Sequence, residues 1–243
     1  MASSNSNSIT AMIWDYDGTL VDSREKNLHV TRRIVKQVAG VDPAQFPALQ
    51  TLEEYMLNNR AMRNWRDLYT KTFGLTEEQT DEAGKLWSEY QLDDTTPTPL
   101  FKGIRDALSS LQHFPHGIVS QNSRDAIAQT LRQDTLLHLF SSIIGYEEVD
   151  LRLQKPDPTG LLMCIEKLTR WEQGTVLYVG DHETDMECAF NTNRVLKQRG
   201  LGIHLLSIGA SYSLDDGSPG WKTKPDYEAK LVGDLTKIVQ SLQ

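Results

Sequence analysis

The chain has 243 residues, of which 24% are charged and 39% hydrophobic, and its formal net charge is −8. These values are typical of a globular protein, and the acidic excess disfavours a nucleic-acid partner, because such binding depends on Lys and Arg. No apolar run is long enough to span a bilayer, so we expect no membrane partner. Residues 1–10 predict a disordered polar tail without signal-peptide features, and two cysteines without paired spacing fit a cytoplasmic protein.

Short apolar runs bounded by turn residues predict the strands of one sheet. The runs cover residues 11–14, 116–120, 143–144, 175–180 and 203–208. Helical patterns separate them: Leu161, Ile165 and Leu168, for example, recur at i, i+4 and i+7. Alternation of strands and helices indicates an α/β fold, with a parallel sheet flanked by helices.

The stretch of residues 22–97 interrupts this alternation, because it is rich in helix formers and lacks a strong strand pattern. Asp22-x-x-Glu25 and Thr76-x-x-Gln79 resemble capping boxes at helix starts. We therefore predict a small all-helical domain over 22–97, inserted into a core domain made of residues 11–21 and 98–243.

Two carboxylates end the first apolar run, in the sequence Asp15-Tyr16-Asp17-Gly18-Thr19. In a straight strand, residues i and i+2 point to the same side, so Asp15 and Asp17 can serve one reaction centre. Gly18 lets the chain turn sharply after the second acid.

Three later motifs also follow predicted strands. Ser120-Gln121 precedes a helical pattern, where a hydroxyl and free N–H groups suit a phosphate oxygen, although helix capping is the alternative. Lys155 stands in a proline-rich turn before the next helix. Asp181 and Asp185 lie four residues apart after the fourth run, and such carboxylates suit Mg²⁺.

In this order the four motifs resemble those of the haloacid dehalogenase-like phosphohydrolases, and the resemblance covers nearly the whole chain from Met12 onward. It implies a Rossmann-like core with a helical cap that closes over substrate. It also implies that Asp15 is the nucleophile, forming an aspartyl-phosphate, and that Asp17 is the general acid and base. Family members that cleave carbon–halogen bonds lack the second acid, so Asp17 favours a phosphatase.

The same resemblance assigns further roles around the reaction centre. Ser120 and Lys155 would complete the catalytic set, and Mg²⁺ would be held by Asp15, the Asp17 carbonyl and Asp181, with Asp185 acting directly or through water. The substrate phosphate group would contact Gly18, Thr19, Ser120, Gln121 and Lys155.

The motifs and the helical insert most resemble phosphoglycolate-phosphatase-like members. We therefore expect a small phosphorylated metabolite as substrate and a monomer or homodimer, with nucleotide or sugar phosphates as alternatives. Arg60 and Arg63 are candidates for binding an anionic substrate, although a solvated helix face explains them equally well.

Two alternatives concern the class of the protein. Asn27 stands where phosphomutases of this fold carry a histidine, which disfavours a mutase. A non-enzymatic regulator that accepts phosphate on an aspartate is the alternative from a different class. The basic segment 192–202 has two possible interpretations, a helix extension or a surface that binds a partner.

Overall fold

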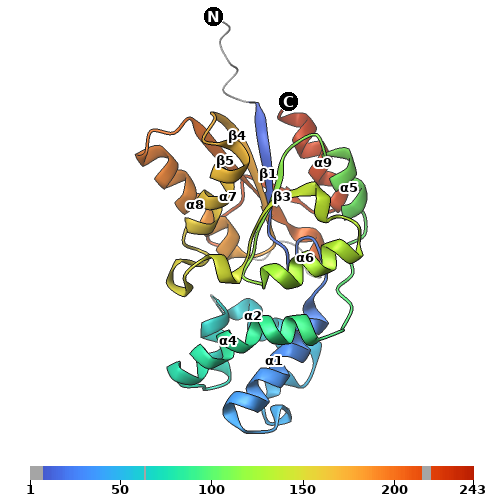
Figure 1. The fold of residues 1–243 in the computed structure, drawn as a ribbon, viewed down its shortest axis with the longest axis vertical. Helices are drawn as coiled ribbons and strands as arrows, with labels where there is room; N and C mark the ends of the chain where they lie inside the picture. Colours follow the sequence, from blue (N-terminus) through green and yellow to red (C-terminus); the bar gives the residue numbers. More distant parts are fainter. Residues whose placement is uncertain (1–7, 63, 215–219) are drawn as a thin grey trace, which may run out of the picture. The chain divides into compact units, whose positions relative to one another are not determined.

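The computed structural model describes residues 8–62, 64–214 and 220–243, and it divides into two compact units (Figure 1). The core unit contains Met1–Val21 and Leu100–Gln243, and the helical unit contains Asp22–Pro99. The chain returns to the core unit at Leu100, two residues later than expected. Leu100 forms an antiparallel bridge with Val21, and the Phe101 N–H donates to the Leu20 carbonyl at 3.1 Å.

Strands and helices alternate along the core unit. The strands are β1 (Ile9–Trp14), β2 (His116–Val119), β3 (Phe140–Ile144), β4 (Gly174–Gly180), β5 (Ile203–Ala210) and β6 (Tyr227–Ala229). The core helices are α5 (Ile104–Ser110), α6 (Arg124–Gln133), α7 (Thr159–Thr169), α8 (Glu183–Gln198) and α9 (Val232–Ser241). The helices of the other unit are α1 (Arg24–Ala39), α2 (Leu52–Ala61), α3 (Trp65–Asp67) and α4 (Glu77–Asp93). Short 3₁₀ turns include η6 (Leu151–Leu153) and η7 (Ser211–Ser213).

The six strands form one parallel sheet in the order β3-β2-β1-β4-β5-β6, which confirms the predicted α/β class. The five predicted apolar runs supply the first five strands. The sixth strand, β6, was not predicted, because three residues at a sheet edge carry no recognisable pattern.

The prediction of a disordered tail over residues 1–10 is wrong at its end, because β1 begins at Ile9. The Thr175 N–H donates to the Ser8 carbonyl at 2.9 Å, and the Thr10 hydroxyl donates to the Thr175 carbonyl at 3.2 Å. These bonds extend the pairing with β4 beyond the apolar run. Residues 1–7 lie outside the described part of the chain.

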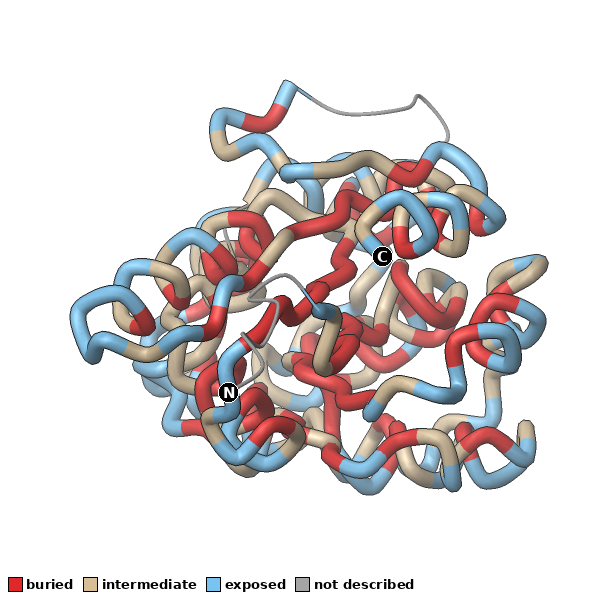
Figure 2. Tube along the Cα trace, turned by 90° about the horizontal axis from the view of Figure 1, so that it is seen from above, coloured by how far each residue is buried: buried red, intermediate tan, exposed pale blue. Residues whose placement is uncertain are grey.

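Helices cover both faces of the sheet. Met12 and Trp14 of β1 belong to a buried cluster that includes residues of α5, α6 and α9. Ala11 and Ile13 point to the other face, into a cluster with α7 and α8. Figure 1 shows these two helix groups on opposite sides of the strands, and Figure 2 shows the buried residues as long runs through the central strands. β1 is therefore buried on both faces, as expected for a central parallel strand.

The helical unit has its own apolar cluster, which includes Leu28 and Ile34 of α1, Tyr55 of α2 and Ala83 of α4. The predicted capping box at Thr76 is confirmed: its hydroxyl accepts from the Gln79 N–H, and the Gln79 side chain accepts from the Thr76 N–H. No helix among the described residues is both long and apolar enough to cross a membrane.

The capping box predicted at Asp22 is wrong. The residue before α1 is Ser23, which makes no capping hydrogen bond through its side chain. Asp22 accepts from the Arg24 guanidinium at 2.7 and 2.6 Å and from the Arg24 N–H at 3.3 Å. A nearby guanidinium offers this carboxylate stronger, charge-assisted bonds than a backbone N–H would.

Candidate active site

The two acidic motifs follow β1 and β4, which are neighbours in the sheet. The Asp15 N–H donates to the Val179 carbonyl at 2.8 Å, so Asp15 lies beside the end of β4, and Asp181 follows immediately after that strand. The strand order changes direction between β1 and β4. In doubly wound sheets this point, at the carboxyl ends of the strands, is where ligands bind.

Two glycines allow the acidic side chains to pack against the backbone. Gly18 has φ +80°, and a Cβ atom added there would lie 2.2 Å from Asp181 Oδ2. A Cβ atom on Gly180 would lie 2.5 Å from Asp185 Cγ. Both positions therefore need glycine, because any side chain would displace a carboxylate of the site.

Lys155 links two of these carboxylates. Its Nζ donates to Asp15 Oδ1 at 2.6 Å and to Asp185 Oδ1 at 2.8 Å, and all three residues are buried. Lys155 lies in the loop between η6 and α7, so this contact joins the third sequence motif to the first and the fourth. The predicted positions of Asp15, Lys155, Asp181 and Asp185 meet at one end of the sheet.

Burial and charge shift the pKa values of these groups in different directions. Burial raises the pKa of Asp15 to about 7, although Lys155 opposes the shift. Burial also raises the pKa of Asp181, with Asp15 and Asp185 adding to the effect. For Asp185, burial would raise the pKa, but Lys155 and the Tyr178 hydrogen bond together outweigh burial and the pKa is lowered. Burial would lower the pKa of Lys155, yet the two carboxylates raise it.

The donor set fits a hard divalent cation. Carboxylate oxygens of Asp15, Asp181 and Asp185 all lie within 4.8 Å of one another. Among the described residues, the ion pairs of Asp15 and Asp185 are both with Lys155, so two of the three carboxylates share one ammonium. Oxygen-only ligands and surplus negative charge are the features that Mg²⁺ selects.

Asn122 links Asp17 to Ser120. The Asn122 side-chain amide donates to Asp17 Oδ1 at 3.2 Å, and the Asn122 N–H donates to Ser120 Oγ at 3.0 Å. The carboxylate of Asp17 is not among the three that form the acidic cluster. The residue preceding α6 is Ser123, so Ser120 is not the cap of that helix.

Thr19 and Gln121 contact the same group of residues. The Thr19 hydroxyl donates to Asp181 Oδ1 at 3.3 Å, and the Gln121 side-chain amide reaches the Lys155 carbonyl at 3.5 Å. The predicted phosphate-binding positions therefore surround the acidic cluster at the carboxyl ends of β1, β2 and β4.

Three residues at the site were missed by sequence reasoning. The Tyr178 hydroxyl donates to Asp185 Oδ1 at 2.7 Å, the Tyr212 hydroxyl donates to the Thr19 carbonyl at 2.7 Å, and Asn122 contacts Asp17 as described. Asn122 could have been found from the sequence, because it lies only two residues after the predicted site residue Ser120. Tyr178 reads as an ordinary strand residue, and Tyr212 lies in a turn with no motif.

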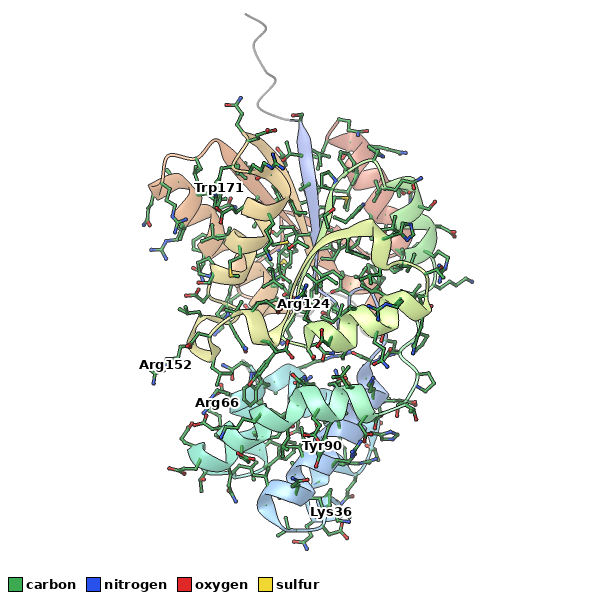
Figure 3. All side chains as sticks on the ribbon, in the orientation of Figure 1. Lys36, Arg66, Tyr90, Arg124, Arg152 and Trp171 are labelled. Atoms are coloured by element: carbon green, nitrogen blue, oxygen red, sulfur yellow. The ribbon has the colours of Figure 1, made fainter. Side chains whose placement is uncertain are left out.

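The predicted arginines belong to the helical unit. Arg60 is exposed on α2, and Arg63 lies outside the described residues. The neighbouring Arg66, labelled in Figure 3, donates to Glu77 and Asp81 at 2.7 Å. Substrate binding by Arg60 or Arg63 stays a prediction.

Comparisons with known proteins agree with this arrangement. Residues 12–195 match the model of the haloacid dehalogenase-like hydrolase family. The chain is 24% identical to "Pyrophosphatase PpaX" of Listeria monocytogenes, covering 96% of this chain and 97% of that protein. It is 27% identical to a phosphoglycolate phosphatase of Synechococcus elongatus, covering 96% and 98%. The solved structure of a predicted phosphatase from Clostridium acetobutylicum has the same fold, with a TM-score of 0.72 at 19% identity, covering 96% and 100%.

Proposed function

Because the chain belongs to the haloacid dehalogenase-like hydrolase family, we propose that it is a magnesium-dependent phosphatase of a small phosphomonoester, with phosphoglycolate as the first candidate substrate. The observation that carries the proposal is the buried contact of Lys155 with Asp15 and Asp185, beside Asp181 at the ends of β1 and β4. Burying several charged groups together lowers the stability of a fold, and clusters of this kind occur mainly at functional sites.

Asp15 is the nucleophile in this proposal. One of its carboxylate oxygens forms a bond to phosphorus while the bond from phosphorus to the leaving oxygen breaks, which gives an aspartyl-phosphate. Lys155 fixes the orientation of Asp15 through the 2.6 Å contact and offers positive charge to the phosphoryl oxygens. Bound Mg²⁺, held by Asp15, the Asp17 carbonyl and Asp181, would neutralise the charge that otherwise repels the attacking carboxylate.

Asp17 moves the protons. It gives a proton to the leaving alkoxide in the first step and takes one from water in the second, when that water attacks phosphorus and releases Asp15. Asn122 holds the Asp17 carboxylate from the β2 side through the 3.2 Å hydrogen bond. Ser120, Gln121, Gly18 and Thr19 bind the phosphoryl oxygens in this proposal.

The relatives support two substrates of different chemistry. The Synechococcus relative is named for phosphoglycolate, a phosphomonoester, and the Listeria relative is named for pyrophosphate, a phosphoanhydride. Pyrophosphate is therefore the second candidate. Its leaving group is phosphate, which needs a proton donor far less than an alkoxide does.

The direct test measures phosphate release from phosphoglycolate, pyrophosphate and para-nitrophenyl phosphate, with Mg²⁺ and with EDTA. We expect turnover that requires Mg²⁺ and that Asp15→Asn abolishes. The matched control is Asp125→Asn, which makes the same change at an exposed position in the first turn of α6. Full activity of Asp15→Asn, or equal rates in EDTA, would refute the proposed chemistry.

A second variant separates the two substrates. Asp17→Asn removes the proton donor, so we expect it to slow phosphoglycolate hydrolysis by about 10²–10⁴-fold and pyrophosphate hydrolysis by much less. Equal losses on both substrates would show that Asp17 does not act by protonating the leaving group.

A further inference from the structure

A hollow of about 440 Å³ lies on the surface of the core unit. Residues 152–158 form one wall and residues 191–198 of α8 form the other. None of the carboxylates of the acidic cluster lines it, nor does the Lys155 side chain. The hollow is therefore a site distinct from the candidate active site, although the two share a loop.

The lining mixes apolar residues, Pro156, Pro158 and Val195, with polar ones, and its charged residues are two arginines and one aspartate. It contains the guanidinium groups of Arg152 and Arg194, together with the carboxamides of Gln154, Asn191 and Gln198. The one carboxylate is that of Asp157, whose Oδ1 accepts from the Thr159 N–H at 2.9 Å and the Thr159 hydroxyl at 2.6 Å.

The two arginines are available to a ligand. Both are exposed, and within the described parts of the chain neither guanidinium forms an ion pair with a carboxylate. Figure 3 places Arg152 at the outer edge of the core unit. In a chain of net charge −8, two unpaired guanidinium groups beside one hollow favour an anion that bridges them.

The position of the hollow suggests a role for one residue of the basic segment 192–202. Helix α8 runs to Gln198, so most of the segment is a helix extension, as the simpler sequence interpretation holds. Arg194 lines the hollow, whereas Lys197 and Arg199 are exposed and do not line it. A ligand in the hollow can therefore contact Arg194, whereas substitutions of Lys197 and Arg199 can serve as controls for a general change of charge.

The loop shared with the active site is held by α8. The Asn191 side-chain amide donates to the Pro156 carbonyl at 3.0 Å, and the Cys188 thiol donates to the Asp157 carbonyl at 3.2 Å. Lys155 precedes these residues directly and contacts Asp15 at 2.6 Å. A ligand that joins Arg152 to Arg194 would thus brace the loop that positions Lys155.

We propose that this hollow binds a small polyanion bearing phosphate or carboxylate groups, and that the bound anion regulates the active site through the Lys155 loop. The binding part is independent of the proposed phosphatase activity, and the regulatory part rests on it. Two forked guanidinium groups match the several acceptor oxygens of such an anion.

The binding test is isothermal titration calorimetry of the full chain in EDTA, with tripolyphosphate and, separately, citrate. EDTA removes any metal that would attract an anion to the acidic cluster, and the double variants below identify the hollow as the site that is titrated. We expect one bound anion per chain and a Kd at least about tenfold higher in the double variant Arg152→Glu/Arg194→Glu. The matched control Lys197→Glu/Arg199→Glu has the same net charge and should keep the wild-type Kd. The two probes distinguish a phosphate-bearing from a carboxylate-bearing ligand.

Amide chemical shifts give a second measure of binding that does not depend on heat. We expect the tighter probe to shift the amides of residues 152–158 and 191–198 in the wild type and in the control double variant. No binding by the wild type, or equal weakening in the two double variants, would overturn the proposed site. Circular dichroism confirms that each double variant is folded.

The regulatory part is tested by para-nitrophenyl phosphate hydrolysis at fixed free Mg²⁺, with and without the tighter probe. We expect kcat or KM to change at least about twofold in the wild type and in the control, but not in Arg152→Glu/Arg194→Glu. Unchanged kinetics at a saturating probe concentration would overturn regulation and leave binding intact. An absence of any hydrolysis would count against the phosphatase proposal alone.

Discussion

A buried ion pair of the core unit and an exposed ion pair of the helical unit lie in opposite environments. In the core unit, Lys155 and Asp15 form a contact of 2.6 Å between side chains that are only 7% and 10% exposed. In the helical unit, Arg33 and Asp93 form a contact of 2.7 Å between side chains that are 40% and 67% exposed. The geometry is nearly equal, so the difference lies in the solvent around each pair.

The difference in exposure predicts different contributions of the two ion pairs to stability. Exposed ion pairs contribute little to stability, typically below about 1 kcal/mol, because water and salt screen both partners. A buried pair carries a large desolvation cost, and the loss of one partner leaves an uncompensated charge. Loss of an exposed ion pair of the helical unit should therefore cost little stability, whereas loss of Lys155 from the buried cluster of the core unit should cost much more.

The largest expected effect is that of Lys155→Met. The substitution keeps the length of the side chain but leaves Asp15 and Asp185 without their shared cation. We expect the free energy of unfolding in EDTA at pH 8 to fall by about 3–5 kcal/mol, measured by urea denaturation. Activity should be lost as well.

Lower pH provides the control for this prediction. Asp15 has a pKa of about 7 even with Lys155 present, so the carboxylate protonates readily when the cation is removed. At pH 5 the destabilisation by Lys155→Met should therefore shrink. A loss of the same size at both pH values would mean that Lys155 acts through packing and not through charge.

Asp15→Asn should give the next largest effect, as a dependence of stability on pH in metal-free protein. The pKa of Asp15 in the folded state, about 7, lies above its ordinary value of 3.8, because burial disfavours the charged form. The folded state thus binds the proton more tightly, and the free energy of unfolding of the wild type should fall as pH rises from about 4 to 7, by up to about 4 kcal/mol from this group.

The comparison of wild type and variant isolates this contribution. Asp15→Asn cannot ionise, so it should be more stable than the wild type above pH 7 and equal to it near pH 4, in urea titrations with EDTA. Added Mg²⁺ should stabilise the wild type and reduce the gap, because it binds the folded state with Asp15 ionised. A variant less stable than the wild type at pH 8 without metal would contradict the raised pKa.

Sequence reasoning anticipated the parts of the site that depend on strand ends. Asp15, Ser120 and Asp181 each follow an apolar run, and in a parallel sheet the carboxyl ends of all strands lie at the same edge. That rule brings these residues together without any side-chain detail. The α/β class follows from the alternation of strand and helix patterns, and the helical insert follows from the stretch that interrupts this alternation.

Sequence reasoning could not supply contacts that depend on register and packing. Tyr178 lies inside a fully buried strand, where a tyrosine reads as core, and only its hydroxyl contact with Asp185 shows a polar role. The start of β1 depends on the side chain of Thr10, which bonds to β4 and not to a neighbour in sequence. The three residues of β6 depend on pairing with β5, since their own pattern is too short.

Tyr178→Phe should have a smaller effect than the changes above. Removal of the hydroxyl takes one hydrogen bond from Asp185. Burial raises the pKa of Asp185, and this bond helps Lys155 to lower it. We expect a loss of about 1–2 kcal/mol in the free energy of unfolding and a fall in kcat with little change in KM. Tyr227→Phe, at a partly buried position on β6, is the matched control and should leave both unchanged. A change in KM alone would place Tyr178 in substrate binding instead.

Arg66→Gln in the helical unit should have the smallest effect, although Arg66 makes two ion pairs, with Glu77 and Asp81 at 2.7 Å. The carboxylates are 74% and 55% exposed, so water already solvates them and does so fully when the guanidinium is removed. We expect a loss below about 1 kcal/mol in urea denaturation, and a smaller loss still in 1 M NaCl, where the screening length is about 3 Å. A loss as large as that of Lys155→Met, or one insensitive to salt, would show that exposure does not govern the value of these pairs, and the contrast between the two units would fail.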